Sequence, residues 1–295
     1  MAKFTEETLN TWRQPPSDTE ETKLNNAERM VKEALKESDE LKSKNIDVFG
    51  QGSYPNNTNV KLNSDIDINA CLSDTIFVNI PKDKKQEDFG YSDSEYKFSE
   101  YKDSVEKALV AKFGRSEVVR NDKCITIKGN SYRVEADVVP TFKYNRHEEN
   151  GGKAIGTKFI TDKGKSIENY PIQHIDNGKK KNSDTQRRFK RLTRIFKRLR
   201  YKMIDDGENV SDNISSFLLE SLIFNLPDNI FNDNDTWTDR LKESIKYLHN
   251  ATKEEKTCKE WGEVSELLYL FHSRRKWKYS DVNSFLVKAW KYLEY

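Results

Sequence analysis

The sequence predicts an α/β (α+β) fold, in which a lobe containing a mixed sheet is followed by a helical carboxy-terminal lobe. Short runs of alternating apolar and polar residues between about 46 and 145 are typical of strands. From about residue 184 onward, apolar residues recur at helical spacing. The 295 residues include 15 Phe, 13 Tyr and 5 Trp, which can build a substantial core although 34% of the residues are charged.

Strands and helices alternate in the first lobe. Apolar spacing predicts a helix over about 18–38, and IDVFGQGS predicts a strand that ends in a glycine turn. SDIDINACL predicts the next strand, in which Ile66, Ile68 and Ala70 alternate with polar residues. A charged loop over 82–97 and a helix over 99–113 follow. SEVVRNDKCITIKGNSYRVEADVVPTFKY then predicts two or three strands, with a turn near Gly129 and Asn130.

The domain boundary is expected in the Gly-, Asn- and Lys-rich segment 145–184, which predicts loops and short strands. We place one lobe, with its long amino-terminal helix, at 1–160 and the mainly helical lobe at 161–295. Because a cleft between two lobes is a usual place for a ligand, we expect the active site there.

Several protein classes are excluded by cysteine usage and by the lack of long apolar segments. The three cysteines form no CxxC pair, which argues against a disulfide framework or a structural zinc site. MAKFTEETLN has no apolar signal core, and the run from Phe217 to Phe224 is too short to span a bilayer. We therefore expect a cytoplasmic protein that binds no membrane.

The stretch SDIDI places Asp65 and Asp67 on one face of a strand, because residues i and i+2 point the same way. Their mutual repulsion would be relieved by a hard cation such as Mg²⁺, which prefers oxygen ligands. An exposed polar strand face is the alternative, and the acidic pair alone does not decide between the two.

Two further features favour a metal site that binds phosphate. A Gly52-Ser53 turn brings backbone N–H groups and a hydroxyl close to a phosphate. In RVEADVVPTF, Glu135 and Asp137 share a strand face, and we prefer Asp137 because it leads into the hydrophobic VVP stretch. A third carboxylate on a neighbouring strand would complete a two-metal site for in-line phosphoryl transfer.

Residues 179–202 are strongly basic, with twelve Lys or Arg and a single acid, Asp184. An apolar stripe at helical spacing runs through the segment, so an amphipathic helix is expected. Three interpretations remain open: a solvated face, nonspecific nucleic-acid binding, or recognition of a triphosphate by one or two of these groups.

The combination of Gly-Ser, ten residues, SDID and the later Asp137 is similar to the pattern of polymerase-β-like nucleotidyltransferases. GSYPNNTNVKLNSDIDI resembles the matching segment of cGAS/DncV-like nucleotidyltransferases (CD-NTases). TWRQPPSDTEETK, IENYPIQHIDNGKKKN and RFKRLTRIFKRLR resemble the bacterial clade E members, the CdnE group. The resemblance covers residues from about 11 to 226.

This resemblance implies an enzyme that joins two nucleoside triphosphates into a cyclic dinucleotide, with UTP and/or ATP as substrates and pyrophosphate released. Asp65, Asp67 and Asp137 would hold two Mg²⁺ ions, for which Mn²⁺ can substitute. A separate effector would respond to the product in bacterial anti-phage (CBASS) signalling. Nucleic acid would not be required, and we expect a monomer.

The resemblance also implies nucleotide contacts from both lobes: Gln51, Gly52, Ser53, Asn169, Lys197, Ser215, Ser216 and Phe217. Lys197 matches a lysine that contacts the outer phosphates. In VSDNISSFLLES, Asp212 is expected to cap a helix whose first turn holds the two serines, where free N–H groups attract phosphate. Phe217 is expected to stack on the donor base, with a core position as the alternative.

Base choice is assigned to an asparagine, because its amide carries both a donor and an acceptor. Asn169 in ENYP is the candidate, Asn177 in HIDNG is the competitor, and a turn role is open for both.

Two other functions remain as alternatives: a linear oligonucleotide or RNA nucleotidyltransferase, and an inert nucleotide- or RNA-binding module. The inert module would lack an acid or the Gly-Ser turn, and all of these are present.

Overall fold

The structure, a computed structural model, describes residues 2–15, 18–60, 66–273 and 275–295. The chain divides into two compact units. The helical unit comprises Met1–Pro16, Asn56–Lys61 and Ile172–Tyr295, and the sheet unit comprises Ser17–Pro55 and Leu62–Pro171.

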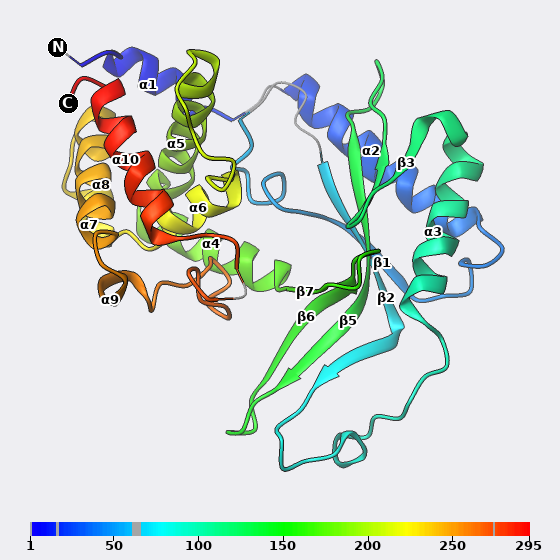
Figure 1. Cartoon of the computed structure of the whole chain (residues 1–295). Coiled ribbons are helices and arrows are strands. Elements are labelled where there is room, and N and C mark those ends of the chain that lie inside the picture. The colour runs from blue at the N-terminus through cyan, green and yellow to red at the C-terminus, as the bar shows by residue number, and fades with distance from the viewer. Residues whose placement is uncertain (1, 16–17, 61–65, 274) are drawn as a thin grey trace. The chain divides into compact units, whose positions relative to one another are not determined.

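The sheet unit is built on one mixed sheet (Figure 1), which has seven strands within the described residues. The order across the sheet is β1-β2-β5-β4-β3, and the β6–β7 pair extends from β5. Only β2 and β5 pair in parallel among these strands. The strands are β1 Ile46–Gln51, β2 Ile66–Asn79, β3 Val118–Arg120, β4 Ile125–Ile127, β5 Ala136–His147, β6 Lys153–Ile160 and β7 Ser166–Asn169. The predicted α/β fold is confirmed.

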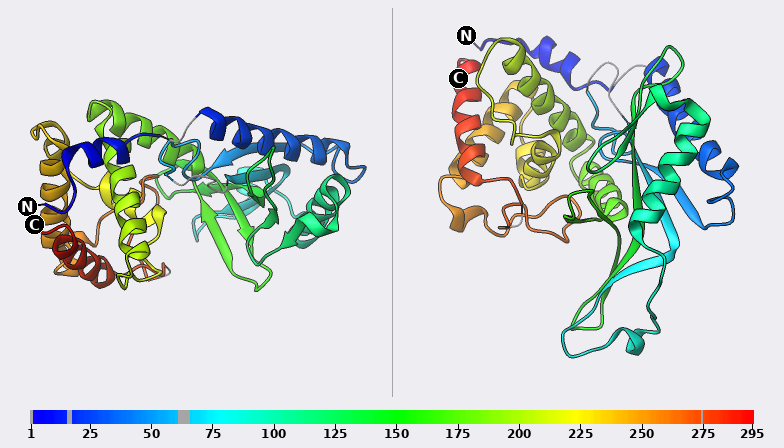
Figure 2. Two further views of the ribbon diagram at one scale, coloured as in Figure 1. Left: turned by 90° about the horizontal axis from the view of Figure 1, so that it is seen from above. Right: turned by 45° about the vertical axis from the view of Figure 1, so that its right-hand side comes forward.

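Helices α2 (Asp18–Glu37) and α3 (Phe98–Phe113) cover one face of this sheet, as Figures 1 and 2 show. Ile66, Ile68 and Ala70 of β2 are fully buried in the core that these helices share with the sheet. Since alternate strand residues point to opposite faces, Asp67 and Asn69 emerge on the other face. The predicted alternation and both predicted helices are confirmed. Short 3-10 turns, η1 Gln86–Phe89 and η2 Arg115–Glu117, flank α3.

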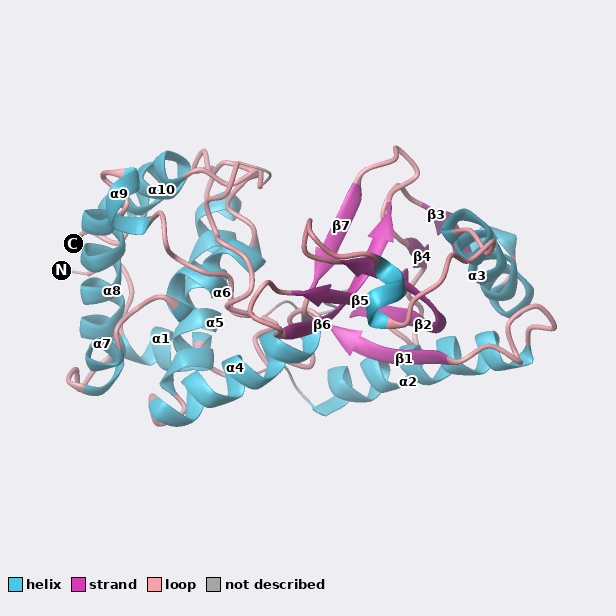
Figure 3. Ribbon diagram, turned by 90° about the horizontal axis from the view of Figure 1, so that it is seen from below, coloured by secondary structure: helices cyan, strands magenta, loops and turns pink. Residues whose placement is uncertain are grey.

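The helical unit is organised around α5 (Arg188–Asp205), visible in Figure 3 among its neighbouring helices. Its apolar stripe, which includes Phe189, Leu192, Phe196 and Leu199, is buried in the core of this unit. No helix in the described part of the chain has the length and apolar character needed to cross a bilayer. The other helices are α1 Glu6–Trp12, α4 Pro171–Asp184, α6 Ser216–Phe224, α7 Asp228–Asn232, α8 Trp237–Ala251, α9 Glu255–Cys258 and α10 Tyr279–Tyr292.

Helix α4 shows that the prediction of loops and short strands over 145–184 was wrong for its last part. Pro171 occupies the first helical position, where a missing N–H costs nothing. Gly178 and the run of Asn and Lys lowered the helical signal, since glycine costs about 1 kcal/mol relative to alanine inside a helix. Gly178 is buried, so packing within the helical unit offsets this cost.

The units also divide the chain differently from the predicted lobes 1–160 and 161–295. The sheet unit continues to Pro171, because β7 pairs with β6. Helix α1 groups with the helical unit, where Leu9 is fully buried. The Glu6 carboxylate there accepts hydrogen bonds from the N–H groups of Trp237 and Thr238 at 2.8 and 2.9 Å, which caps α8.

Lys197 and Glu220 form a buried ion pair inside the helical unit, at 2.8 Å and with side chains 2% and 5% exposed. Lys197 also donates to the carbonyl and the hydroxyl of Thr58 at 3.1 and 3.0 Å. Glu220 accepts from the Thr58 hydroxyl at 2.7 Å and from His174 Nε2 at 3.2 Å. Burial alone would raise the pKa of Glu220, but Lys197 and His174 outweigh it and hold that pKa well below its usual range. This network ties Thr58 to α5 and α6.

Lys197→Met should destabilise the helical unit by about 3–5 kcal/mol, because it leaves the Glu220 charge buried without its main partner. The five tryptophans, Trp12, Trp237, Trp261, Trp277 and Trp290, all belong to the helical unit. Urea unfolding followed by tryptophan fluorescence therefore reports on this unit.

The matched control is Lys190→Met on the same helix. The Lys190 ammonium makes no ion pair with the described residues, so its removal should leave the unfolding midpoint of the helical unit in place. Equal midpoints for Lys197→Met and wild type would show that the ion pair does not hold this unit together.

Candidate active site

Asp67 and Asp137 lie side by side on the two parallel strands. The register of β2 and β5 pairs these residues directly. Neighbouring strands lie about 4.8 Å apart and paired residues point to the same face, so the two carboxylates share the face opposite α2 and α3. Asp65, the other predicted acid of this pair, lies outside the described residues.

The turn after β1 reaches this acidic pair. Gln51 pairs with Asp67 across the β1–β2 ladder. Gly52 has φ 72°, and a Cβ at this position would lie 2.6 Å from Asp67 Oδ2. Only glycine therefore allows the backbone to approach the carboxylate this closely. Ser53 follows in the turn, and its hydroxyl makes no hydrogen bond to other described residues.

The side chain of Gln51 is held by a polar chain that the sequence did not reveal. Asn69, fully buried, donates Nδ2 to Gln51 Oε1 at 3.1 Å. Thr141 donates its hydroxyl to Asn69 Oδ1 at 2.7 Å. With Oε1 occupied, the Nε2 group of Gln51 remains as a donor beside the acidic pair. Asn69 stands two residues after Asp67, and this spacing alone could have placed it on the same strand face as the acid.

The donor atoms on this face fit a hard divalent cation. Asp67 and Asp137 offer carboxylate oxygens, the ligands that Mg²⁺ prefers. Cys124 lies nearby, and burial together with Asp137 raises the pKa of its thiol to about 11, so it stays neutral. Within the described ranges, no three His, Cys, Asp or Glu side chains are arranged to hold a metal ion. The predicted set of three acids includes Asp65, which is outside those ranges.

The geometry favours Asp137 over Glu135 as the acid that partners Asp67. Asp137 faces Asp67 in register and accepts a hydrogen bond from Thr126 Oγ1 at 2.5 Å. Glu135 precedes β5 with an exposed side chain, and its carbonyl accepts the Ile66 N–H at 3.0 Å. Thr126, in the short strand CITIK, was not singled out in the sequence, because nothing local marks its pairing with Asp137.

Asn169 lies on the same sheet face as the acids. It pairs with Thr157 of β6, which pairs with Lys143 of β5, and Lys143 shares its face with Asp137. The Asn169 amide makes no hydrogen bond to the rest of the described chain, so its donor and acceptor are both available. The competitor Asn177 lies in α4 and donates Nδ2 to the Val264 carbonyl at 3.0 Å, a contact internal to the helical unit.

Lys197, the predicted phosphate contact, has its three donors directed at Thr58 and Glu220. A phosphate would have to replace one of these bonds. Lys190 lies two turns earlier on the same side of α5, and its half-buried ammonium makes no hydrogen bond or ion pair with the described residues. Burial lowers its pKa. Lys190 can therefore bind an anion without giving up an existing hydrogen bond, whereas Lys197 cannot.

Helix α6 begins at Ser216 and its N-cap is Ser215, so the prediction that Asp212 caps it was wrong. The Ser215 hydroxyl accepts the Leu218 N–H at 3.2 Å and is the N-cap. Ser216 follows in the first turn, with its Oγ 3.4 Å from the Tyr201 hydroxyl. Both serines thus lie at the start of α6, where the first backbone N–H groups of the helix have no partner within the helix.

Phe217 is packed between two rings of the helical unit. It stacks on Trp277 with centroids 5.4 Å apart and an interplanar angle of 16°. The His174 ring also lies against Phe217, with the two ring centroids 5.5 Å apart. One ring face is thus already covered by an indole, which favours the packing role over stacking on a base.

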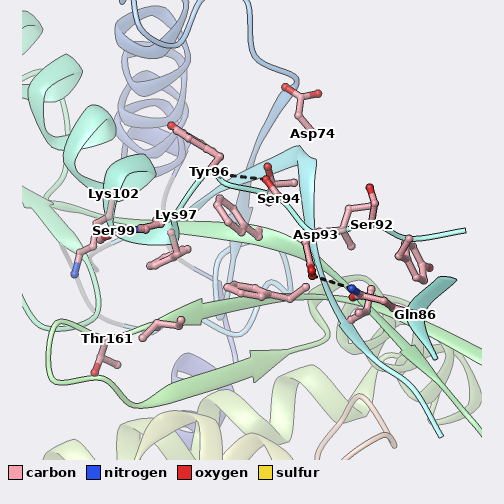
Figure 4. Close-up of a pocket in the computed structure, with 18 of the residues that line it drawn as sticks. Asp74, Gln86, Ser92, Asp93, Ser94, Tyr96, Lys97, Ser99, Lys102 and Thr161 are labelled. Carbon is pink, nitrogen blue, oxygen red and sulfur yellow. Dashed lines mark hydrogen bonds between the residues drawn. The ribbon is translucent and has the colours of Figure 1, made fainter. Parts of the chain in front are cut away.

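A cavity of about 1080 Å³ lies elsewhere in the sheet unit, between the distal half of β2, the 86–97 loop and the start of α3 (Figure 4). Hydrogen bonds within this loop, such as Gln86 Nε2 to Asp93 Oδ1 at 2.8 Å, hold it in place. Neither Asp67 nor Asp137 lines the cavity. It is therefore separate from the acidic pair.

Comparison with known proteins agrees with this geometry. The model for the C-terminal helical domain of cGAS/DncV-like nucleotidyltransferases matches residues 176–294. The cyclic dipyrimidine nucleotide synthase CdnE of Cecembia lonarensis is 64% identical over 295 residues, which cover all of both chains.

Two solved structures share the fold along nearly the whole chain. The CdnE cyclic dinucleotide synthase of Elizabethkingia meningoseptica, with GTP and Apcpp, is 36% identical, with a TM-score of 0.84 and coverage of 99% of this chain and 100% of that one. The CdnE c-UMP-AMP synthase of Rhodothermus marinus, with Apcpp and Upnpp, is 26% identical, with a TM-score of 0.85 and coverage of 97% and 95%.

Similarity along the full length, the helical-domain match and the paired acids beside a Gly-Ser turn lead to one conclusion: the chain belongs to the cGAS/DncV-like nucleotidyltransferases, among the CdnE enzymes.

Proposed function

We propose that this chain is a cyclic dinucleotide synthase. In each of two successive reactions, a ribose hydroxyl oxygen bonds to an α-phosphorus, the bond from that phosphorus to the β-phosphate oxygen breaks, and pyrophosphate leaves. The second reaction closes the ring. The observation that carries the proposal is the pairing of Asp67 with Asp137 beside the Gly52 turn. The 64% identity to a cyclic dipyrimidine nucleotide synthase supports it.

Asp67 and Asp137, together with Asp65, are the residues that we assign to two Mg²⁺ ions. When bound, such ions would stabilise the charge on the attacking and leaving oxygens. The chain itself contributes two carboxylates whose spacing is set by strand register and whose repulsion a cation relieves. We assign Asp137 to the side of the attacking hydroxyl, whose deprotonation its carboxylate favours.

Several donors are assigned to contact the triphosphate, and each unit is considered by itself. In the sheet unit, we assign this role to the Gly52 and Ser53 N–H groups, the Ser53 hydroxyl and Gln51 Nε2. In the helical unit, we assign it to the start of α6, with Ser215 and Ser216, and to the basic side of α5. On that side Lys197 would act only after exchanging a hydrogen bond, whereas Lys190 would act directly.

For the bases, we propose two pyrimidine nucleotides with UTP preferred, and ATP as the next candidate. The relatives differ in the nucleotides they use, and the pyrimidine choice follows the relative with 64% identity. Asn169 is the residue that we assign to reading the base, because its amide is uncommitted and faces the same side as Asp137. The product would be read by a separate effector in anti-phage signalling.

The pure protein with Mg²⁺ and each pairwise mixture of the four nucleoside triphosphates should yield a product with the mass of a cyclic dinucleotide. The yield should be highest with UTP or with UTP and CTP. Mass spectrometry after phosphatase treatment is the measurement, because a ring has no terminal phosphate to remove. Linear, phosphatase-sensitive products would indicate the alternative nucleotidyltransferase, and no product at all would contradict the proposal.

Asp67→Asn and Asp137→Asn should each reduce product formation by more than the about 10–100-fold that loss of an outer-shell partner costs. Their unfolding midpoints should stay near that of wild type, because both side chains face away from the core. Asp47→Asn is the matched control, an exposed aspartate of β1 without a hydrogen bond to other described residues. Full activity in both site variants would remove the assignment.

Asn169→Ser should lower incorporation of UTP relative to ATP about tenfold, the equivalent of one lost hydrogen bond of about 1.4 kcal/mol. Competition between labelled UTP and ATP measures the ratio. Asn177→Ser, which removes only the contact to Val264, should leave the ratio unchanged. A changed ratio for Asn177→Ser alone would transfer the role to Asn177.

A further inference from the structure

Asp137 is the last member of a hydrogen-bond chain that crosses the β3–β4 hairpin. Thr126 Oγ1 on β4 donates to Asp137 Oδ1 at 2.5 Å, and Asn121 Nδ2 in the hairpin turn donates to the same Thr126 oxygen at 2.8 Å. Thr126 and Asp137 are direct partners in the antiparallel register of β4 and β5. The Cys124 thiol lies beside the same carboxylate and makes a side-chain hydrogen bond with Asp137.

The direction of each bond follows from the chemistry of the groups. An ionised carboxylate only accepts, so the single hydroxyl hydrogen of Thr126 has to point at Asp137. The lone pairs of that hydroxyl are then free to accept, and the group that Asn121 presents to them has to be its NH₂. The chain therefore has one consistent direction, from Asn121 through Thr126 to Asp137.

Asn121 is itself fixed by the backbone around it. Its N–H donates to the Cys124 carbonyl at 2.9 Å, which closes the turn. Lys102 of α3, 3% exposed, donates its ammonium to the carbonyls of Asn121 and Asp122 at 3.1 and 3.0 Å and pairs with Asp162 at 2.9 Å. Figure 4 shows Lys102 at the edge of the cavity beside α3. The far end of the chain is thus anchored to a buried cation.

We propose that Thr126 and Asn121 are positioning residues for Asp137. They hold Oδ1 against β4 and keep the carboxylate in one rotamer, so that Oδ2 is presented to a divalent cation. The inference rests on the metal-binding role proposed above for Asp137. Groups that orient a metal ligand in this way cost about 10–100-fold in metal affinity or activity when they are removed.

The probe is Mn²⁺ alone, titrated into the protein without nucleotide and followed by the electron paramagnetic resonance signal of the free ion. Thr126→Val removes the hydroxyl at nearly constant volume and should weaken Mn²⁺ binding about 10–100-fold. Thr126→Ser keeps the hydroxyl and should restore binding. Asn121→Ala should give a smaller loss, because the threonine can still donate to Asp137.

Thr75→Val is the matched control. Thr75 is also a partly buried strand threonine, and its hydroxyl makes no hydrogen bond within the described chain, so Mn²⁺ affinity should not change. Thermal unfolding without metal should be the same for all four variants. If Thr126→Val unfolds early, Thr126→Ser and Asn121→Ala still test the chain, because each keeps a polar partner in place.

The outcomes separate this inference from the proposed function. Wild-type Mn²⁺ affinity in both Thr126→Val and Asn121→Ala would overturn the inference, whether or not the enzyme makes cyclic product. Weakened binding in Thr126→Val with rescue in Thr126→Ser would support it, even if wild type makes no cyclic dinucleotide. If wild type makes no cyclic dinucleotide, only the proposed reaction is contradicted, and the positioning role of Thr126 stands.

Discussion

The register between β2 and β5 is the constraint on which the candidate site depends. It sets Asp67 beside Asp137 although they are 70 positions apart in the sequence. Ile66, Ile68 and Val138 enforce it, because a slip of one residue would expose them and bury the carboxylates. Two like charges about 5 Å apart repel by roughly 1 kcal/mol in water, and more in a lower dielectric. The apolar core of the sheet unit thus holds the acids in an arrangement whose mutual repulsion a bound cation would relieve.

The helical unit deals with charge in the opposite way, by internal pairing. A solvated basic face was one of three interpretations left open for α5. In the structure Lys197 is among the most buried side chains, and Arg194 donates to backbone carbonyls. Burying such a charge is tolerated only when it is paired and hydrogen-bonded. Glu220 and Thr58 supply those partners for Lys197, and His174 in turn hydrogen-bonds Glu220. The lysine that was predicted to contact a phosphate therefore joins the Thr58 segment to α5 and α6 within its own unit.

Local sequence patterns predicted most strands and helices of the sheet unit. They predicted few of the hydrogen bonds and packing contacts between segments that are far apart in the sequence. Period-two alternation in SDIDINACL was sufficient to assign Ile66 and Ile68 to the core and Asp67 to the polar face. The hydrophobic VVP run likewise pointed to Asp137. The chain from Asn121 through Thr126 was not visible, because it depends on strand pairing across a hairpin. Helix α4 was not predicted because Gly178 lowers the helical propensity of its segment. That Leu9 packs in the core of the helical unit could not be predicted either, because this packing depends on residues far away in the sequence.

We propose that Asp67 and Asp137 together bind a divalent cation. A crystal structure with Mn²⁺ and a non-hydrolysable UTP analogue, analysed by anomalous scattering at the manganese edge, tests it most directly. We expect an anomalous peak within coordination distance, about 2 Å, of an oxygen of each carboxylate. Manganese bound elsewhere, with both carboxylates away from any metal, would contradict it.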